Sequence, residues 1–260
     1  MKLLDLSLPA LMYNYVKNKP DKVIDHISPS MLGGCPRAHY FAIKHVKQTT
    51  PPSPGALLNF EMGFLYEQLM AKALDGNVKL LDTRCVFDKE LNVKGEFDFA
   101  LVDDNGEVEV IDCKTESILA AGHRKRQKID YIEASERYVI QLGTYMLLLR
   151  RKGCTVNRGR LVSITKDNGM MHEYFVPYTQ ELEDKIMVKI DYMNDCLKRN
   201  VVPDCTCEGW MVGYSSYGNP NTQIKNSTGK IVNSECCPDS IEQLEQWREE
   251  FNKKEKLNEY

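Results

Sequence analysis

Hydrophobic residues recur at helical spacing in several stretches of this 260-residue chain. The clearest stretch is residues 57–74, in which Leu57, Leu58, Phe64, Leu65 and Leu69 follow the period of an α-helix. Further helices are expected at residues 3–18, 28–47, 131–152 and 179–200, and from about residue 239 onward. Residues 49–55 (TTPPSPG) are expected to form a loop, because consecutive prolines interrupt a helix.

Strand-like patterns occupy residues 78–87, 91–102, 107–114, 158–166 and 170–177. The turn sequences at 103–106 (DDNG) and 167–169 (DNG) each predict a hairpin. Residues 201–239 are rich in Cys, Gly, Asn and Ser and show no periodicity. This order of helices, a three-stranded meander, a helix, a hairpin and a helix predicts an α/β core with a mixed sheet.

Two carboxylates and a lysine are expected to meet in the first hairpin. If the hairpin turns on residues 104–106, residues whose numbers sum to 210 face each other, so Asp98 faces Asp112, and Lys114 shares their side of the sheet. Carboxylates are disfavoured inside strands, and a divalent cation such as Mg²⁺ would supply their counter-charge. The group suits metal-assisted phosphodiester hydrolysis, although a surface salt bridge would explain this pattern alone equally well.

Three further features add to this group. Glu67, which follows Gly63 on the preceding helix, is a candidate third carboxylate, although a lone helical Glu is more often solvated. Gln141 and Tyr145 project from one face of a helix and suit contacts to a phosphate or a nucleotide. The basic run that follows Lys114 would bind phosphates, although such runs are usually solvated loops. Its cationic residues are Arg124, Lys125, Arg126 and Lys128.

Composition limits the classes of function. The charged residues, 34 Lys+Arg and 37 Asp+Glu, exclude bulk electrostatic coating of nucleic acid, so any DNA contact must be local. No apolar run is long enough for a membrane helix, and the N-terminus has no pattern of an export signal, which predicts a cytoplasmic protein of a bacterium or a phage-infected cell. Nine cysteines without an export signal argue against a disulfide framework, and the tight pairs Cys205/Cys207 and Cys236/Cys237 suggest a metal site.

The four motifs together resemble the RecB-like branch of the PD-(D/E)XK nuclease superfamily. The chain contains Gly63…Glu67, residues 95–98 (GEFD), residues 112–115 (DCKT) and Gln141…Tyr145 in the family's order, although many relatives carry His where Glu67 stands. The resemblance implies a restriction-endonuclease-like core with a central mixed sheet. It implies that Mg²⁺ or Mn²⁺ binds to Glu67, Asp98, Asp112 and the carbonyl of Cys113. Lys114 would then act on the attacking water, and Gln141 and Tyr145 would support the site and the DNA strand.

Residues 28–40 resemble the N-terminal cysteine motif of a subgroup, the iron–sulfur exonucleases associated with CRISPR adaptation; other features resemble phage recombination exonucleases. In that subgroup one N-terminal and three C-terminal cysteines hold a [4Fe-4S] cluster that joins the two ends of the chain. Here the candidates are Cys35, Cys205, Cys207, Cys236 and Cys237, although the C-x-C spacing departs from the subgroup's C-x2-C. Zinc bound to four of them, or reduced unligated thiols, are the alternatives. Cys85, Cys113, Cys154 and Cys196 are interpreted as structural.

The leading hypothesis is therefore a metal-dependent DNA exonuclease that acts on ends or single strands in recombination, repair or phage replication. Residues 1–54 would form a helical region with the first cysteine and Arg37 as a further DNA contact, residues 55–200 the nuclease core, and residues 201–260 the second cysteine region. No helicase motif is visible, so a helicase or recombination partner would supply any unwinding. The alternatives are a catalytically weak binding or assembly subunit with a structural metal and, less favoured, a sequence-specific endonuclease.

Overall fold

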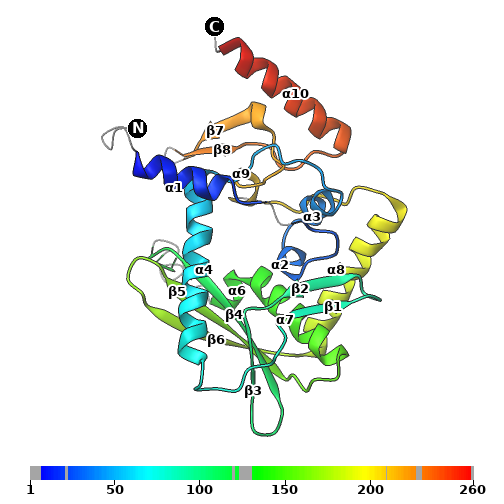
Figure 1. The fold of residues 1–260 in the computed structure, drawn as a ribbon. Helices are drawn as coiled ribbons and strands as arrows, with labels where there is room; N and C mark the ends of the chain where they lie inside the picture. Colours follow the sequence, from blue (N-terminus) through cyan, green and yellow to red (C-terminus); the bar gives the residue numbers. More distant parts are fainter. Residues whose placement is uncertain are drawn as a thin grey trace.

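A computed structural model describes residues 7–20, 23–118, 121–122, 131–208, 210–226 and 230–258 of the chain. The helices are α1 (Leu8–Lys17), α2 (Pro29–Leu32), α3 (Pro36–Ile43), α4 (Pro54–Leu74), α6 (Tyr131–Ala134), α7 (Glu136–Arg151), α8 (Gln180–Arg199), α9 (Trp210–Gly213), the 3-10 helix η2 (Pro220–Thr222) and α10 (Ile241–Asn258). The strands are β1 (Cys85–Asp88), β2 (Val93–Glu96), β3 (Phe99–Val102), β4 (Val108–Glu116), β5 (Arg158–Thr165), β6 (Met171–Pro177), β7 (Gln223–Lys225) and β8 (Ile231–Asn233). Figure 1 shows how they are arranged.

The core is a four-stranded mixed sheet between two layers of helices. Its strand order is β3-β4-β5-β6, with β4 and β5 parallel and the two outer pairs antiparallel. Helix α4 covers one face, where Tyr66, Met70 and Leu74 pack against Phe99 and Ile111. Helix α7 covers the other face and is buried continuously over residues 140–149, and α8 packs against α7. The α/β class with a central mixed sheet is confirmed.

The first hairpin has the register that the sequence predicts. Phe99 pairs with Ile111 and Ala100 with Val110, so that facing residue numbers sum to 210. Helix α8 also begins as expected, because the Thr179 side chain accepts a hydrogen bond from the Leu182 N–H at 3.2 Å. The β5–β6 hairpin pairs as predicted around residues 167–169.

Several predicted elements are divided in the structure. Instead of one strand at 91–102, β2 pairs with β1 in a separate two-stranded sheet, and β3 begins the central sheet. The three-stranded meander is therefore wrong, and of residues 78–87 only those from Cys85 belong to a named strand. The change of sheet occurs at Phe97 and Asp98, where the Asp98 carboxylate binds the Cys113 N–H and so replaces a ladder contact.

The helices predicted at 28–47 and 131–152 are each two helices. Cys35 has an extended backbone between α2 and α3, because the residue before a proline disfavours the helical conformation. Gly33 is required there, since a Cβ atom would lie 2.4 Å from the Arg137 carbonyl oxygen. Helices α6 and α7 are separated at Ser135. Helix α4 begins at Pro54, earlier than expected, with the Ser53 side chain capping the Ala56 N–H at 3.3 Å.

The segments before and after the core pack against each other at the top of Figure 1. The Thr49 N–H donates to the Ser216 carbonyl at 3.1 Å, and the Thr50 hydroxyl donates to the Ser215 carbonyl at 2.6 Å. Residues 201–239, predicted to be irregular, contain the short β7–β8 hairpin as well as α9 and η2. Among the described residues, no helix is both long and apolar enough to cross a membrane.

Candidate active site and cysteine cluster

Two buried carboxylates lie together where β3 meets β4. Asp112, in the middle of β4, is 1% exposed. Asp98 immediately precedes β3, and its Oδ2 accepts a hydrogen bond from the Cys113 N–H at 2.6 Å. The confirmed register and this hydrogen bond bring the two carboxylates into one site, as the sequence predicts.

The surroundings of both carboxyl groups raise their pKa values. Burial, followed by the negative charge of Asp112, raises the pKa of Asp98 to about 7. Burial also raises the pKa of Asp112, although the neighbouring Lys114 ammonium opposes this effect. Burial and the nearby carboxylates raise the pKa of the Cys113 thiol to about 12. Ionisation of both carboxyl groups is therefore less favourable here than in water, and a cation bound beside them would favour it.

Lys114 is held over the site by three different groups. Its Nζ lies 2.5 Å from Asp112 Oδ2 and donates a hydrogen bond to Gln141 Oε1 at 3.1 Å. Gln141 in turn donates from Nε2 to Asp112 Oδ1 at 3.0 Å, which closes a ring of three side chains. The ammonium also lies 4.9 Å from the centre of the Tyr138 ring, a cation–π contact. Gln141 therefore orients both the lysine and the carboxylate.

Glu67 reaches the same site from α4, on the other side of the sheet. Its negative charge contributes to the raised pKa values of both Asp98 and Asp112. The carboxylate forms an ion pair with Arg84, whose Nε donates to the Phe97 carbonyl at 3.1 Å. Arg84 was not among the residues expected from the sequence, because nothing in its own segment indicates that it would face Glu67.

Tyr145 supports the backbone that leads into the site. Its hydroxyl donates to the Glu96 carbonyl at 2.8 Å, and burial raises its pKa. The ring leaves no room for a side chain at Gly95, where a Cβ atom would lie 2.8 Å from Tyr145 Cε1 and 2.7 Å from Pro29 Cδ. The glycine of the GEFD motif is thus explained by a close approach of β2, α2 and α7.

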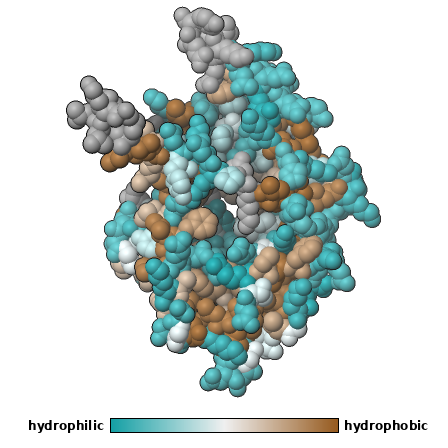
Figure 2. Space-filling view, in the orientation of Figure 1, coloured by the Kyte–Doolittle hydropathy of each residue, from teal (hydrophilic) through white to brown (hydrophobic). Residues whose placement is uncertain are grey.

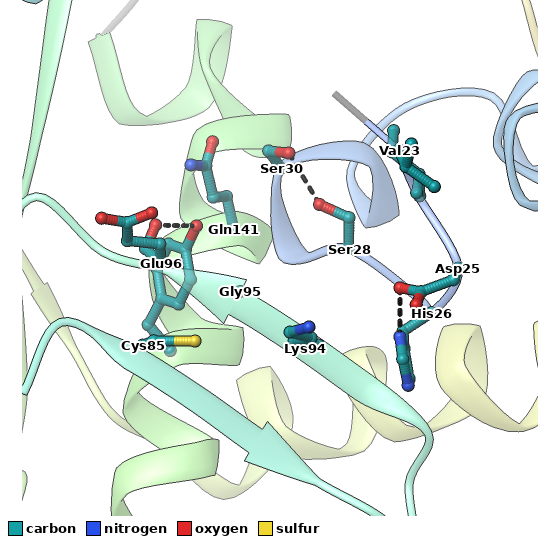
Figure 3. A pocket seen from close by; sticks show the side chains of 12 residues that line it. Val23, Asp25, His26, Ser28, Ser30, Cys85, Lys94, Gly95, Glu96 and Gln141 are labelled. Atoms are coloured by element: carbon teal, nitrogen blue, oxygen red, sulfur yellow. Dashed lines mark hydrogen bonds and ion pairs between the residues drawn. The ribbon is translucent and has the colours of Figure 1, made fainter. Parts of the chain in front are cut away.

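A cavity of about 310 Å³ adjoins the site on the side of the N-terminal segment. Gln141, Tyr145 and Glu96 line its inner end, and Ser28, Ser30, His26, Lys94 and others line the rest. In Figure 3 Gln141 enters from α7, Glu96 lies on β2, and the Ser28–Ser30 hydroxyl contact faces them. The space-filling view is hollowed near its centre, where hydrophilic residues predominate (Figure 2).

The donor set suits a hard divalent cation. Among the described residues, the Lys114 ammonium is the partner of Asp112 Oδ2, at 2.5 Å. Carboxylate oxygens are the ligands that Mg²⁺ and Mn²⁺ prefer, and a cation would stabilise the ionised forms of Asp98 and Asp112. Asp98, Asp112 and Glu67 are therefore able to hold such an ion.

Four thiols from three distant segments meet in a second site. The sulfur atoms of Cys35, Cys205, Cys207 and Cys237 all lie within 4.8 Å of one another. The fifth candidate, Cys236, has its sulfur 3.4 Å from that of Cys205 but does not belong to this group of four. Hydrogen bonds from the Cys207 and Cys237 thiols lower the pKa of Cys35 far below its usual value. The expected cluster of cysteines from the N- and C-terminal regions is confirmed.

Of the positive residues expected to contact DNA, the structure describes Arg37 but not the basic run. Arg37 is 8% exposed, and its guanidinium donates to the Pro203 carbonyl at 2.7 Å, to the Cys237 carbonyl at 3.3 Å and to Asp239. Its guanidinium is thus buried in contacts with the C-terminal region, where a phosphate would not reach it. The basic run with Arg124, Lys125, Arg126 and Lys128 lies outside the described residues.

A known protein family matches most of this chain. The family model of the PD-(D/E)XK nuclease superfamily matches residues 35–259. No curated protein matches the chain. Among solved structures, SSO0001 is 20% identical with a TM-score of 0.47, covering 74% of this chain and 87% of that one. The alkaline exonuclease LHK-Exo from Laribacter hongkongensis is 10% identical with a TM-score of 0.42, covering 68% and 90%; its complex with dAMP gives 11%, 0.49, 68% and 89%. On the family match, which spans most of its length, this chain belongs to the PD-(D/E)XK nuclease superfamily.

Proposed function

We propose that this chain is a Mg²⁺- or Mn²⁺-dependent deoxyribonuclease that degrades DNA from ends or as single strands. The observation that carries the proposal is the buried pair Asp98 and Asp112, with Lys114 held 2.5 Å from Asp112 and Glu67 adjacent. Buried carboxylates are costly in a protein core, and a metal ion bound between them would stabilise their ionised form.

Each side chain has a distinct task in this proposal. Asp98, Asp112 and Glu67 hold the ion, which when bound supplies an activated water and charge neutralisation at the phosphate. Lys114 donates a proton or hydrogen bond at the attacking or developing oxygen, and Gln141 keeps its ammonium in place. Tyr145 keeps the backbone at Glu96 next to Asp98, so that the carboxylate points at the site.

The test measures degradation of end-labelled linear single-stranded, linear double-stranded and closed circular DNA in Mg²⁺ or Mn²⁺. We expect the wild type to degrade the linear substrates, and Asp112→Ala and Lys114→Ala to lower the rate by about 10²-fold or more, because the first removes a ligand of the metal ion and the second removes the cation beside the reacting oxygen. The position of the label among the products gives the polarity of digestion.

Two exposed residues provide matched controls: Asp104→Ala removes a carboxylate in the same hairpin, and Lys89→Ala removes a surface ammonium. Both should keep the wild-type rate. Equal degradation by the wild type and both site variants would refute the proposal. Tight DNA binding without cleavage of any substrate would favour a binding or assembly subunit, and discrete cuts in circular DNA would favour an endonuclease.

We also propose that Cys35, Cys205, Cys207 and Cys237 hold a metal group, either zinc or a [4Fe-4S] cluster. The support is the convergence of four thiols from segments about 170 and 200 residues apart in the chain. Zinc–sulfur bonds place the sulfurs of a tetrahedral site about 3.8 Å apart. The Cys35–Cys205 distance of 3.8 Å fits that single ion, whereas the resemblance implies the cluster. Iron, sulfide and zinc analysis of the purified protein distinguishes them.

A further inference from the structure

Helix α4 presents two phenylalanines to solvent beside the candidate active site. Phe60 is 58% exposed and Phe64 is 57% exposed. Because they are four residues apart on a helix, their rings lie on the same edge, one turn from each other. Single exposed apolar residues are ordinary, but two aromatic rings in register on one helix edge form a surface that a ligand could cover.

This edge of α4 leads directly to Glu67. Glu67 is three residues after Phe64 and seven after Phe60, so all three project from nearly the same side of the helix. At the rise of an α-helix, the rings lie roughly 4.5 Å and 10.5 Å along the axis from Glu67. Glu67 forms an ion pair with Arg84, whose Nε donates to the Phe97 carbonyl at 3.1 Å, one residue before Asp98. The two rings therefore form a track that ends at the carboxylates.

The other edges of α4 are occupied or of a different kind. Tyr66 and Met70 pack against the central sheet. Helix α1 contacts the N-terminal half of α4, where Lys19 and Glu61 form an ion pair at 2.6 Å. The remaining outer edge carries the aliphatic residues Leu65 and Leu69, which are 58% and 63% exposed. Aromatic rings are thus found on the edge that points toward the site, and aliphatic side chains on the edge that points away from it.

A cation accompanies the aromatic track. Lys166, from the turn after β5, donates a hydrogen bond from Nζ to Asn59 Oδ1 at 3.1 Å, one residue before Phe60. Asn59 is uncharged, and within the described ranges Lys166 forms no ion pair with a carboxylate. A single nucleic-acid strand presents bases and phosphates in alternation. The surface offers matching groups one after another: rings for stacking, the Lys166 ammonium and the candidate hydrolytic site.

We propose that Phe60 and Phe64 form a stacking platform for successive bases of single-stranded DNA on its way to the carboxylates, with Lys166 contacting a phosphate. The inference rests on the proposed nuclease function and names the form of substrate that the site takes. The rings are roughly 6 Å apart along the helix, a separation that lets an extended strand place one base on each. Phenyl rings offer no hydrogen bonds to base edges, so the platform is expected to tolerate any sequence.

The test measures binding of fluorescent oligothymidylate, without divalent metal, to the wild type and to Phe60→Ala, Phe64→Ala and the double variant. A matched strand of the same length carries abasic residues in place of thymidine. We expect the double variant to bind oligothymidylate at least about tenfold more weakly than the wild type does, because two stacked bases are lost. Binding of the abasic strand should be unchanged. Lys166→Ala should weaken both strands alike and reduce the salt dependence.

Matched controls use the opposite edge of the same helix. Leu65→Ala and Leu69→Ala remove a similar amount of exposed apolar surface and should keep wild-type affinity. Phe64→Trp should retain binding, whereas Phe64→Leu, which is apolar but has no π face, should not. Equal affinity of all variants, equal loss on the abasic strand, or equal loss in the leucine variants would each overturn the proposal.

A dimer through this face is a separate outcome. If sedimentation shows that the wild type is dimeric and the double phenylalanine variant is monomeric, the occupant is a second copy and the platform is refuted. Because binding is measured without catalysis, a wild type that binds bases but cleaves nothing would refute the nuclease proposal and leave the platform standing. If the wild type cleaves DNA and all phenylalanine variants keep its full activity, only the platform is refuted.

Discussion

At the scale of single residues, the most unusual side chain outside the candidate active site is His39. It is fully buried, and its Nε2 accepts a hydrogen bond from the Ser28 N–H at 3.0 Å. This acceptor role places the proton on Nδ1, for which no partner exists among the described residues. Burial lowers the pKa of His39 to about 4, so the imidazole is neutral at physiological pH.

His39 is expected to make stability depend on pH in the mildly acidic range. The unfolded chain protonates this histidine below about 6.5, whereas the folded chain does so only below about 4. The unfolded state therefore binds more protons between these values, and the free energy of unfolding should fall by up to about 3 kcal/mol as the pH falls through that window. Above about pH 6.5 this contribution is fully present and constant.

Urea unfolding at pH 7.5 and pH 4.5 checks this expectation. The wild type should lose about 2 kcal/mol more of its unfolding free energy on acidification than His39→Leu, which cannot titrate. His172→Leu, in which an exposed histidine on β6 is replaced, should keep the wild-type dependence. If wild type and His39→Leu respond to acid identically, the buried neutral histidine is not the cause.

At the scale of elements, the site depends on a close contact between β2, α2 and α7. Gly95 is the point of contact, with Pro29 and Tyr145 both within the space that a Cβ atom would need. The same contact aligns the Tyr145 hydroxyl with the Glu96 carbonyl, two residues before Asp98. A strand that shifts here would move Asp98 away from the Cys113 N–H.

Gly95→Ala is therefore expected to lower the unfolding free energy by about 1–3 kcal/mol, because the added Cβ would overlap the packed side chains of Pro29 and Tyr145. It should also lower nuclease activity, because Asp98 is displaced. Thermal or urea denaturation together with the DNA degradation assay measures both effects. Gly55→Ala, in the first turn of α4 with nothing within 4 Å of the added Cβ, should be neutral or slightly stabilising. Wild-type stability of Gly95→Ala would contradict the close packing.

At the scale of the whole molecule, the two ends of the described chain are tied around the nuclease core. Cys35 precedes the core, Cys205 and Cys207 follow α8, and Cys237 precedes α10. Arg37 adds hydrogen bonds to the Pro203 and Cys237 carbonyls. A metal group bound to these thiols would cross-link three segments and remove conformational freedom from the unfolded chain.

Removal of a ligand should therefore lower both metal content and stability. We expect Cys35→Ser and Cys237→Ser to lose the metal and to melt at least about 5 °C lower than the wild type. Cys236→Ser should keep the metal, because its sulfur lies outside the group of four, and Cys154→Ser is a control far from the cluster in sequence. Elemental analysis and thermal denaturation decide the matter. The metal group would be ruled out if the wild type carries no metal after anaerobic purification and melts at the same temperature as its variants.

Much of the fold could be predicted from the sequence because its signals are local. The DDNG turn sets the β3–β4 register, and Thr179 caps α8. Motif spacing alone also predicts that Asp98, Asp112, Lys114 and Gln141 share a single candidate site. The division of residues 91–102 into β2 and β3 escaped prediction, since strand-forming residues continue on both sides of Asp98, and the break depends on the hydrogen bond from the distant Cys113 N–H.

The sequence by itself determined the α/β class, the order of elements, the carboxylate–lysine pair in one hairpin and the five candidate cysteines, because turn residues, hydrophobic periods and motif spacings act over short distances along the chain. Only the tertiary structure decided that Arg84 pairs with Glu67, that Arg37 is used to hold the C-terminal region, that Cys237 and not Cys236 completes the group of four thiols, and that Phe60 and Phe64 remain uncovered beside the site. These contacts join residues far apart in the chain, and packing against the sheet and between the terminal segments sets which of them face each other.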